Sequence, residues 1–73
     1  MGRAHVLVHD DLLKRIKVDP RLHRQLLVVT AKPFGENMHL LLVSSDRLPE
    51  GYHGQQDLIL DGGQIRFKKD VDV

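Results

Sequence analysis

The sequence predicts a small α+β protein, with a single domain over residues 1–73. We expect an antiparallel sheet of four to five strands and one or two short helices in the N-terminal third. Three observations support this fold class. A chain of 73 residues has room for only one domain. The longest apolar runs, Leu26–Val29 and Leu40–Val43, are short and separated by turn residues, which favours strands over long helices. A glycine pair, Gly62–Gly63, separates two segments that alternate as strands do.

The N-terminal third combines a strand with short helices. Residues Ala4–Val8 have the pattern of a strand. Asp10 is expected to cap a helix over Asp11–Lys17, which has an acidic start and apolar residues on one face. Asp19–Pro20 is a typical pair of cap and first helical residue, so a second helical turn is predicted through Arg24.

A hairpin is predicted in the middle of the chain. Its arms are Leu26–Lys32 and Asn37–Ser44, and they flank the turn segment Pro33–Glu36. Gly35 can take the left-handed conformation that ends such a loop. Both arms are apolar at nearly every position, so we expect this pair at the centre of the sheet.

The C-terminal hairpin is the most strongly specified element. Residues 57–61 and 64–68 flank Gly62–Gly63, whose glycines can both adopt the positive φ of a primed two-residue turn. We expect the last residues, Asp70–Val73, to be frayed. The predicted cross-strand pairs are Leu60 with Ile65, Leu58 with Phe67, Ile59 with Arg66, and Asp57 with Lys68.

The composition excludes several classes of protein. There is no cysteine, so disulfides and thiolate zinc sites are ruled out. No apolar run approaches the roughly 20 residues that span a bilayer, and the first residues lack the layout of a signal peptide. We therefore expect a cytoplasmic protein that does not contact a membrane.

No motif in the sequence indicates catalysis or a cofactor. Five histidines are present, and His5 and His9 have a spacing suited to a helical metal site. In a strand they would lie roughly 13 Å apart, too far to bind one ion. The segment Ser44–Asp46 is better explained as a turn than as a nucleophile, and no phosphate-binding glycine motif occurs. We predict no enzyme activity, no cofactor and no metal.

The near-zero net charge conceals a strong asymmetry along the chain. Residues 14–32 carry six Lys and Arg against one Asp, whereas residues 33–61 carry five acidic residues against one Arg. Such a basic segment could bind an acidic protein surface or a phosphate backbone, or be an ordinary solvated helix face. Nucleic acid is the second choice, because Phe34, Tyr52 and Phe67 are too few and too scattered to stack bases. The basic candidate residues are Lys14, Arg15, Lys17, Arg21 and Arg24.

The first strand supplies a second candidate binding region. We expect it at an edge of the sheet, where its backbone could pair with another chain through the segment around Arg3, His5 and Leu7. Leu48, Tyr52 and Val71 have no assigned place in the core and are also available for docking. These features predict a protein partner, with the chain itself a monomer or a weak homodimer.

The chain as a whole resembles small phage-encoded regulators that bind host bacterial RNA polymerase. The resemblance lies in the 73-residue length, the absence of cysteine, and the opening segment His5–Leu13 that leads into the basic run. It implies a non-enzymatic protein that docks on a polymerase subunit in the cytoplasm of the host cell and blocks promoter engagement or alters elongation. Of these two effects, we expect inhibition of transcription initiation. No motif aligns, so the resemblance assigns no residues.

Overall fold

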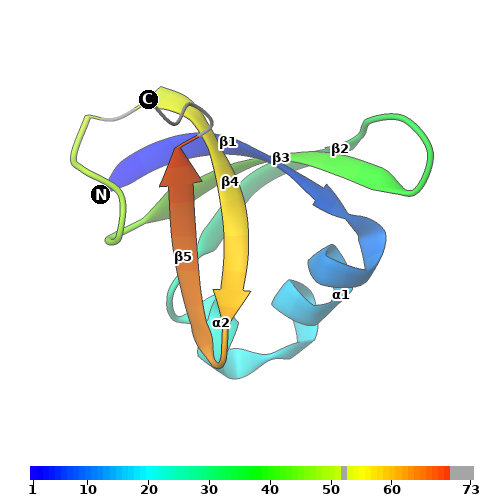
Figure 1. Cartoon of the computed structure of the whole chain (residues 1–73), viewed down its shortest axis with the longest axis horizontal. Coiled ribbons are helices and arrows are strands. Elements are labelled where there is room, and N and C mark those ends of the chain that lie inside the picture. The colour runs from blue at the N-terminus through cyan, green and yellow to red at the C-terminus, as the bar shows by residue number, and fades with distance from the viewer. Residues whose placement is uncertain (52, 70–73) are drawn as a thin grey trace.

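The computed structural model describes residues 1–51 and 53–69, and it confirms a small α+β domain (Figure 1). The frayed tail expected at 70–73 lies outside the described residues, as do Tyr52 and Val71. No helix in the described ranges is long and apolar enough to cross a membrane. The elements are β1 (Gly2–His9), α1 (Asp10–Val18), α2 (Pro20–His23), β2 (Leu27–Pro33), β3 (Met38–Ser45), β4 (His53–Asp61) and β5 (Gln64–Lys69).

The strands form one mixed sheet in the order β2-β3-β1-β4-β5. All neighbouring pairs are antiparallel except β1 and β4, which are parallel over Arg3–His5 and His53–Gln55. The expectation of a purely antiparallel sheet is therefore wrong for one pair. Beyond Gln55, β4 leaves β1 and pairs with β5, and this hairpin crosses the sheet at a steep angle in Figure 1.

The parallel pair arises because the chain crosses the end of β1. β3 ends at Ser45, opposite Gly2, and the following loop carries the chain to the other side of β1. That loop packs directly on Gly2, where an added Cβ would overlap the carbonyl oxygen of Pro49 and lie 2.8 Å from the Cβ of Leu48. Leu48 is buried in this contact, so its expected availability for docking is wrong.

β1 lies in the interior of the sheet. Its residues alternate strictly between buried and exposed, with Ala4, Val6 and Val8 facing the core. The expected edge position is wrong, because β3 and β4 occupy both sides of β1 and the edges are β2 and β5. The expectation that both arms of the middle hairpin are central also fails for β2, which is an edge strand with six of its seven residues exposed.

Both helices begin with a side-chain cap. The N-cap of α1 is His9 rather than the predicted Asp10, and its Nδ1 accepts a hydrogen bond from the amide of Asp11 at 3.3 Å. Asp10 is the first residue of the helix, and its carboxylate lies 2.7 Å from Nδ1 of His39 on β3. The cap of α2 is Asp19, as predicted, with its carboxylate accepting from the amide of Arg21 at 2.9 Å.

The C-terminal hairpin has the predicted register at all four pairs. Only Gly62 of the glycine pair has a positive φ, 64°, so the turn requires one left-handed residue rather than two. Ile65 is fully buried, which shows that the hairpin packs across the inner side of the sheet. β4 begins at His53, four residues before the predicted start, because its first residues pair with β1.

The core lies between the sheet and the helices. Leu13 and Ile16 from α1, together with Leu22 from α2, join the inward-facing residues of β1 and β3. Among the residues whose burial is described, the buried apolar ones are Ala4, Val6, Val8, Leu13, Ile16, Leu22, Leu26, Leu41, Val43, Leu48 and Ile65.

Candidate protein-binding surfaces

The sheet presents an apolar face on the side opposite the core. The exposed positions of β1 pair with β3 so that Leu7 lies opposite Leu40 and His5 opposite Leu42. Leu7 is 47% exposed although it belongs to a central strand, and both β3 leucines are only partly buried. We use the name outer sheet face for the group Arg3, His5, Leu7, Thr30, Leu40 and Leu42, and Lys32, opposite Leu40, lies at its border.

The three candidate residues of the first strand therefore share one surface. Arg3, His5 and Leu7 all point away from the buried positions of β1, and all three are exposed. They lie on a face of the sheet rather than along an edge. Docking there uses side chains instead of backbone pairing.

The free edge of β2 is poorly suited to accept another strand. The register shifts between Val28 and Thr30, so a bulge interrupts the strand. Lys32 and Pro33 follow, and proteins use charged residues and proline on edge strands to discourage pairing with other chains. The outer sheet face is consequently a better candidate for docking than this edge.

The basic candidate residues lie on the helices. Lys14, Arg15 and Lys17 are exposed on α1, and the exposed Arg24 follows α2, which packs against α1. We call Lys14, Arg15, Lys17, Arg21 and Arg24 the helical basic surface. Because the buried sides of the helices contact the inner side of the sheet, the core separates this surface from the outer sheet face.

Arg21 differs from the other members because it has an internal partner. Its guanidinium lies 3.2 Å from the carboxylate of Asp19 and also approaches Gly63. The side-chain hydrogen bond from Arg21, followed by the one from its backbone amide, lowers the pKa of Asp19 below the ordinary value of 3.8. Arg21 thus belongs to the cap of α2, and its charge is partly neutralised.

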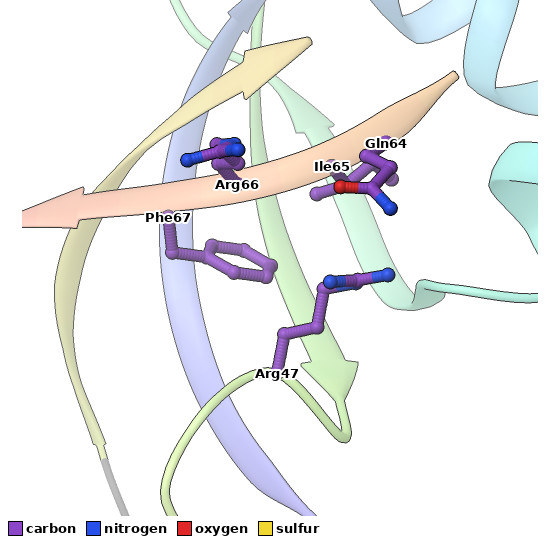
Figure 2. A pocket seen from close by; sticks show the side chains of 5 residues that line it. All are labelled: Arg47, Gln64, Ile65, Arg66 and Phe67. Atoms are coloured by element: carbon purple, nitrogen blue, oxygen red, sulfur yellow. The ribbon is translucent and has the colours of Figure 1, made fainter. Parts of the chain in front are cut away.

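Hollows lie beside the helices and beside β5. The first, about 390 Å³, lies between the helices and β2 and is lined by Ile16, Lys17, His23, Leu26, Leu27 and Val28. The second, about 320 Å³, lies beside β5, where Arg47 from the loop after β3 and Phe67 are on one side of the strand (Figure 2). Arg66 is on the other side of β5, and its guanidinium is 3.0 Å from the carboxylate of Asp61.

The histidines are distributed over the molecule. His5 is on the outer sheet face, His9 caps α1, and His23 lines the hollow between the helices and β2. His39 is hydrogen-bonded to Asp10, and the side chain of His53 lies outside the described atoms. Over residues 1–51 and 53–69, no group of three or more histidine or acidic side chains is placed to hold a metal ion.

The serine and histidine side chains near the sheet have structural partners. The hydroxyl of Ser45 donates to the carbonyl of Gln25 at 2.7 Å and accepts from the amide of Arg47 at 3.1 Å. The hydroxyl of Ser44 lies 3.3 Å from the sulfur of Met1. His39 and Asp10 form a pair, but within the described part of the chain no hydroxyl is hydrogen-bonded to this imidazole. This arrangement lacks the nucleophile that an Asp–His pair would activate.

Two features of the structure were not identified from the sequence. Leu40 and Leu42 were assigned to a central strand and not to a binding surface, although their β2 partners Lys32 and Thr30 are polar and indicate a solvent-facing side. Gln25 was not singled out, yet its side chain connects the region after α2 to the C-terminal hairpin. No local pattern identifies Gln25, because two of its partners follow almost 40 residues later.

Comparisons with protein-family models, curated proteins and solved structures find no match to this chain. Its function is therefore inferred from the residues and their geometry.

Proposed function

We propose that this protein is a non-enzymatic regulator that binds another protein through the outer sheet face. The observation that carries the proposal is the exposure of Leu7 on a central strand, next to Leu40 and Leu42. Single exposed leucines are common, but adjacent ones on neighbouring strands form a patch of the kind that marks interaction sites. Covering the exposed part of each leucine contributes about 1 kcal/mol to association.

The polar neighbours of these leucines supply the rim that such an interface requires. Arg3 and His5 continue the exposed side of β1, and Thr30 lies beside Leu42 on β2. Protein interfaces place apolar anchors at the centre and polar groups around them. The helical basic surface, on the other side of the core, would act mainly by accelerating the approach of an acidic partner.

The most specific form of the proposal is a phage protein that binds host bacterial RNA polymerase and inhibits transcription initiation. Its support is the resemblance in length, composition and layout to small regulators of that kind. The polymerase would supply the apolar surface that covers the outer sheet face. The chain would act by occupying that surface, without chemistry of its own.

The test is binding to purified bacterial RNA polymerase holoenzyme, measured by biolayer interferometry. Leu7→Glu places a charge at the centre of the outer sheet face, and we expect it to weaken binding at least about tenfold. Ile59→Glu is the matched control, because Ile59 is an exposed apolar residue that pairs with Arg66 of β5, beyond the part of β4 that pairs with β1. Circular dichroism must show that both variants are folded. Unaltered binding of Leu7→Glu, or no binding by the wild-type protein, contradicts the proposal.

Binding of nucleic acid is the second candidate function. It is favoured by one observation: within the described ranges no carboxylate lies within salt-bridge distance of Lys14, Arg15, Lys17 or Arg24, and Arg15 acts on Asp19 only through a longer-range electrostatic interaction. A phosphate-binding surface loses affinity steeply between 50 and 200 mM salt for any sequence. Arg24→Glu should then abolish binding to duplex DNA, while Leu7→Glu should leave it unchanged.

A further inference from the structure

The hollow between the helices and β2 has a composition unlike the rest of the surface. Ile16 and Leu26 are buried at its base and Val28 is partly buried. Leu27 also borders the hollow, although its pairing with Ser44 places its side chain on the other side of β2 from Val28. We call these residues, with Lys17 and His23, the helix–strand hollow. Its volume of about 390 Å³ is within the range of sites that hold a small group or a side chain.

The hollow exists because β2 extends beyond the helical layer. α1 packs on β1 and β3, whereas β2 pairs with β3 on the far side from β1. Val28 lies opposite the buried Val43 and faces the same side as the core, but the layer above it ends at Ile16 and Leu26. An apolar recess at the border of the core is left open.

The hollow is lined by nitrogen-bearing side chains rather than by acidic ones. Lys17 and His23 line it, and no carboxylate does. Lys14 precedes Lys17 by about one helical turn on α1, and Arg24 follows His23. The nearest acidic residue along the chain, Asp19, is already bound to Arg21. An apolar recess with a basic border is complementary to an apolar side chain flanked by carboxylates.

We infer that the helix–strand hollow receives a leucine-like side chain of the partner protein, held in a segment rich in aspartate and glutamate. The inference rests on the proposed function, since it specifies the chemistry of part of the protein partner. A nucleic acid fits the hollow less well, because four of its six lining residues are aliphatic and only the imidazole of His23 could stack on a base.

The probe is a blocked twelve-residue peptide with one central leucine between aspartates. Its binding to the ¹⁵N-labelled protein is followed by NMR at low and moderate salt. We expect saturable shifts at the amides of Ile16, Lys17 and Val28. Two matched peptides test the chemistry, one with alanine in place of leucine and one with asparagine in place of each aspartate. Each should bind about tenfold more weakly.

Two variants locate the site. Lys17→Glu reverses a charge at the hollow and should weaken peptide binding about tenfold. Lys32→Glu makes the same change on β2 outside the hollow and should have little effect. Equal effects of the two variants, shifts spread over the whole helical basic surface, or no saturation at millimolar peptide would overturn the inference.

The peptide experiment and the polymerase-binding experiment can fail independently of each other. If Leu7→Glu weakens binding to the polymerase and the peptide does not bind, only the assignment of the hollow is wrong. If the peptide saturates the hollow while the polymerase does not bind, the identity of the partner is wrong and the hollow remains a peptide site.

Discussion

Gln25 connects three parts of the fold through one side chain. Its amide nitrogen donates to the carbonyls of Arg21 at 2.9 Å and Gly63 at 2.8 Å, and its oxygen accepts from the amide of Ile65 at 2.9 Å. In a two-residue hairpin the pair next to the turn is hydrogen-bonded, so the amide of Ile65 points away from β4. Gln25 therefore satisfies a donor on the outer edge of β5.

The contribution of Gln25 to the free energy of unfolding follows from the number of hydrogen bonds that its side chain makes. Three hydrogen bonds, each with a net value of roughly 0.5–1.5 kcal/mol, give a loss of about 2–4 kcal/mol for Gln25→Ala. For a domain of this size the corresponding decrease in Tm is about 10–30 °C. The loss is a large fraction of the total stability, which is only about 4–11 kcal/mol for 73 residues.

Urea unfolding followed by circular dichroism measures this loss, and Gln64→Ala is the matched control. Gln64 is an exposed glutamine on the same strand as Ile65, and its truncation should change the stability by less than about 0.5 kcal/mol. Hydrogen exchange should show faster exchange at the amide of Ile65 in Gln25→Ala. If the two variants have equal stability, the hairpin is held by its apolar contacts and the reasoning about Gln25 is refuted.

Three further predictions concern the core, the loop and the helix cap. Leu41→Ala should destabilise the protein by about 2–5 kcal/mol in urea unfolding, because Leu41 is fully buried and the change leaves a cavity. Gly2→Ala should lower the Tm through a loss of about 1–3 kcal/mol, because the added methyl group displaces Pro49. Since Arg21 lowers the pKa of Asp19, the carboxylate stabilises the fold above pH 3.8, and this contribution disappears as the pH falls through the folded-state pKa. The stability difference between wild type and Asp19→Asn, measured in urea from pH 7 to pH 2, should therefore shrink at the acidic end.

Local chemistry explains which elements the sequence predicts well. The register of the C-terminal hairpin depends on the turn at Gly62 and on neighbouring alternation, so a short window contains the information. The cap of α2 is likewise formed by adjacent residues. His9 was not recognised as the cap of α1, because histidine is an uncommon N-cap and the favoured residue, Asp10, follows it.

The order of the strands could not be obtained in the same way. β1 is placed between β3 and β4 by pairings such as Val6 with Leu41 and Ala4 with Gly54, which join residues far apart in the sequence. The parallel pair also depends on the close approach of a loop to Gly2. A glycine at the start of a strand gives no sign that another segment will cross it.

The candidate surfaces were predicted only in part. Arg3, His5 and Leu7 share one exposed surface, but the strand that carries them is central rather than at an edge. The helix–strand hollow was not predicted, because it arises where β2 projects beyond the helices. Projection of one strand past a packed layer is a property of the assembled fold.

On β3, the apolar residues that the fold requires can be distinguished from the apolar residues of the outer sheet face, which it does not require. Leu41 and Val43 fill the core from one side of β3, so the fold does not need Leu40 and Leu42 to be apolar. The adjacent strand has Thr30 and Lys32 at the matching positions, which shows that polar residues fit this side of the sheet. A sequence that only had to fold would keep the alternation of apolar and polar residues. We propose that the apolar residues on both sides of β3, next to the exposed Leu7, serve to bind a second protein that covers this face.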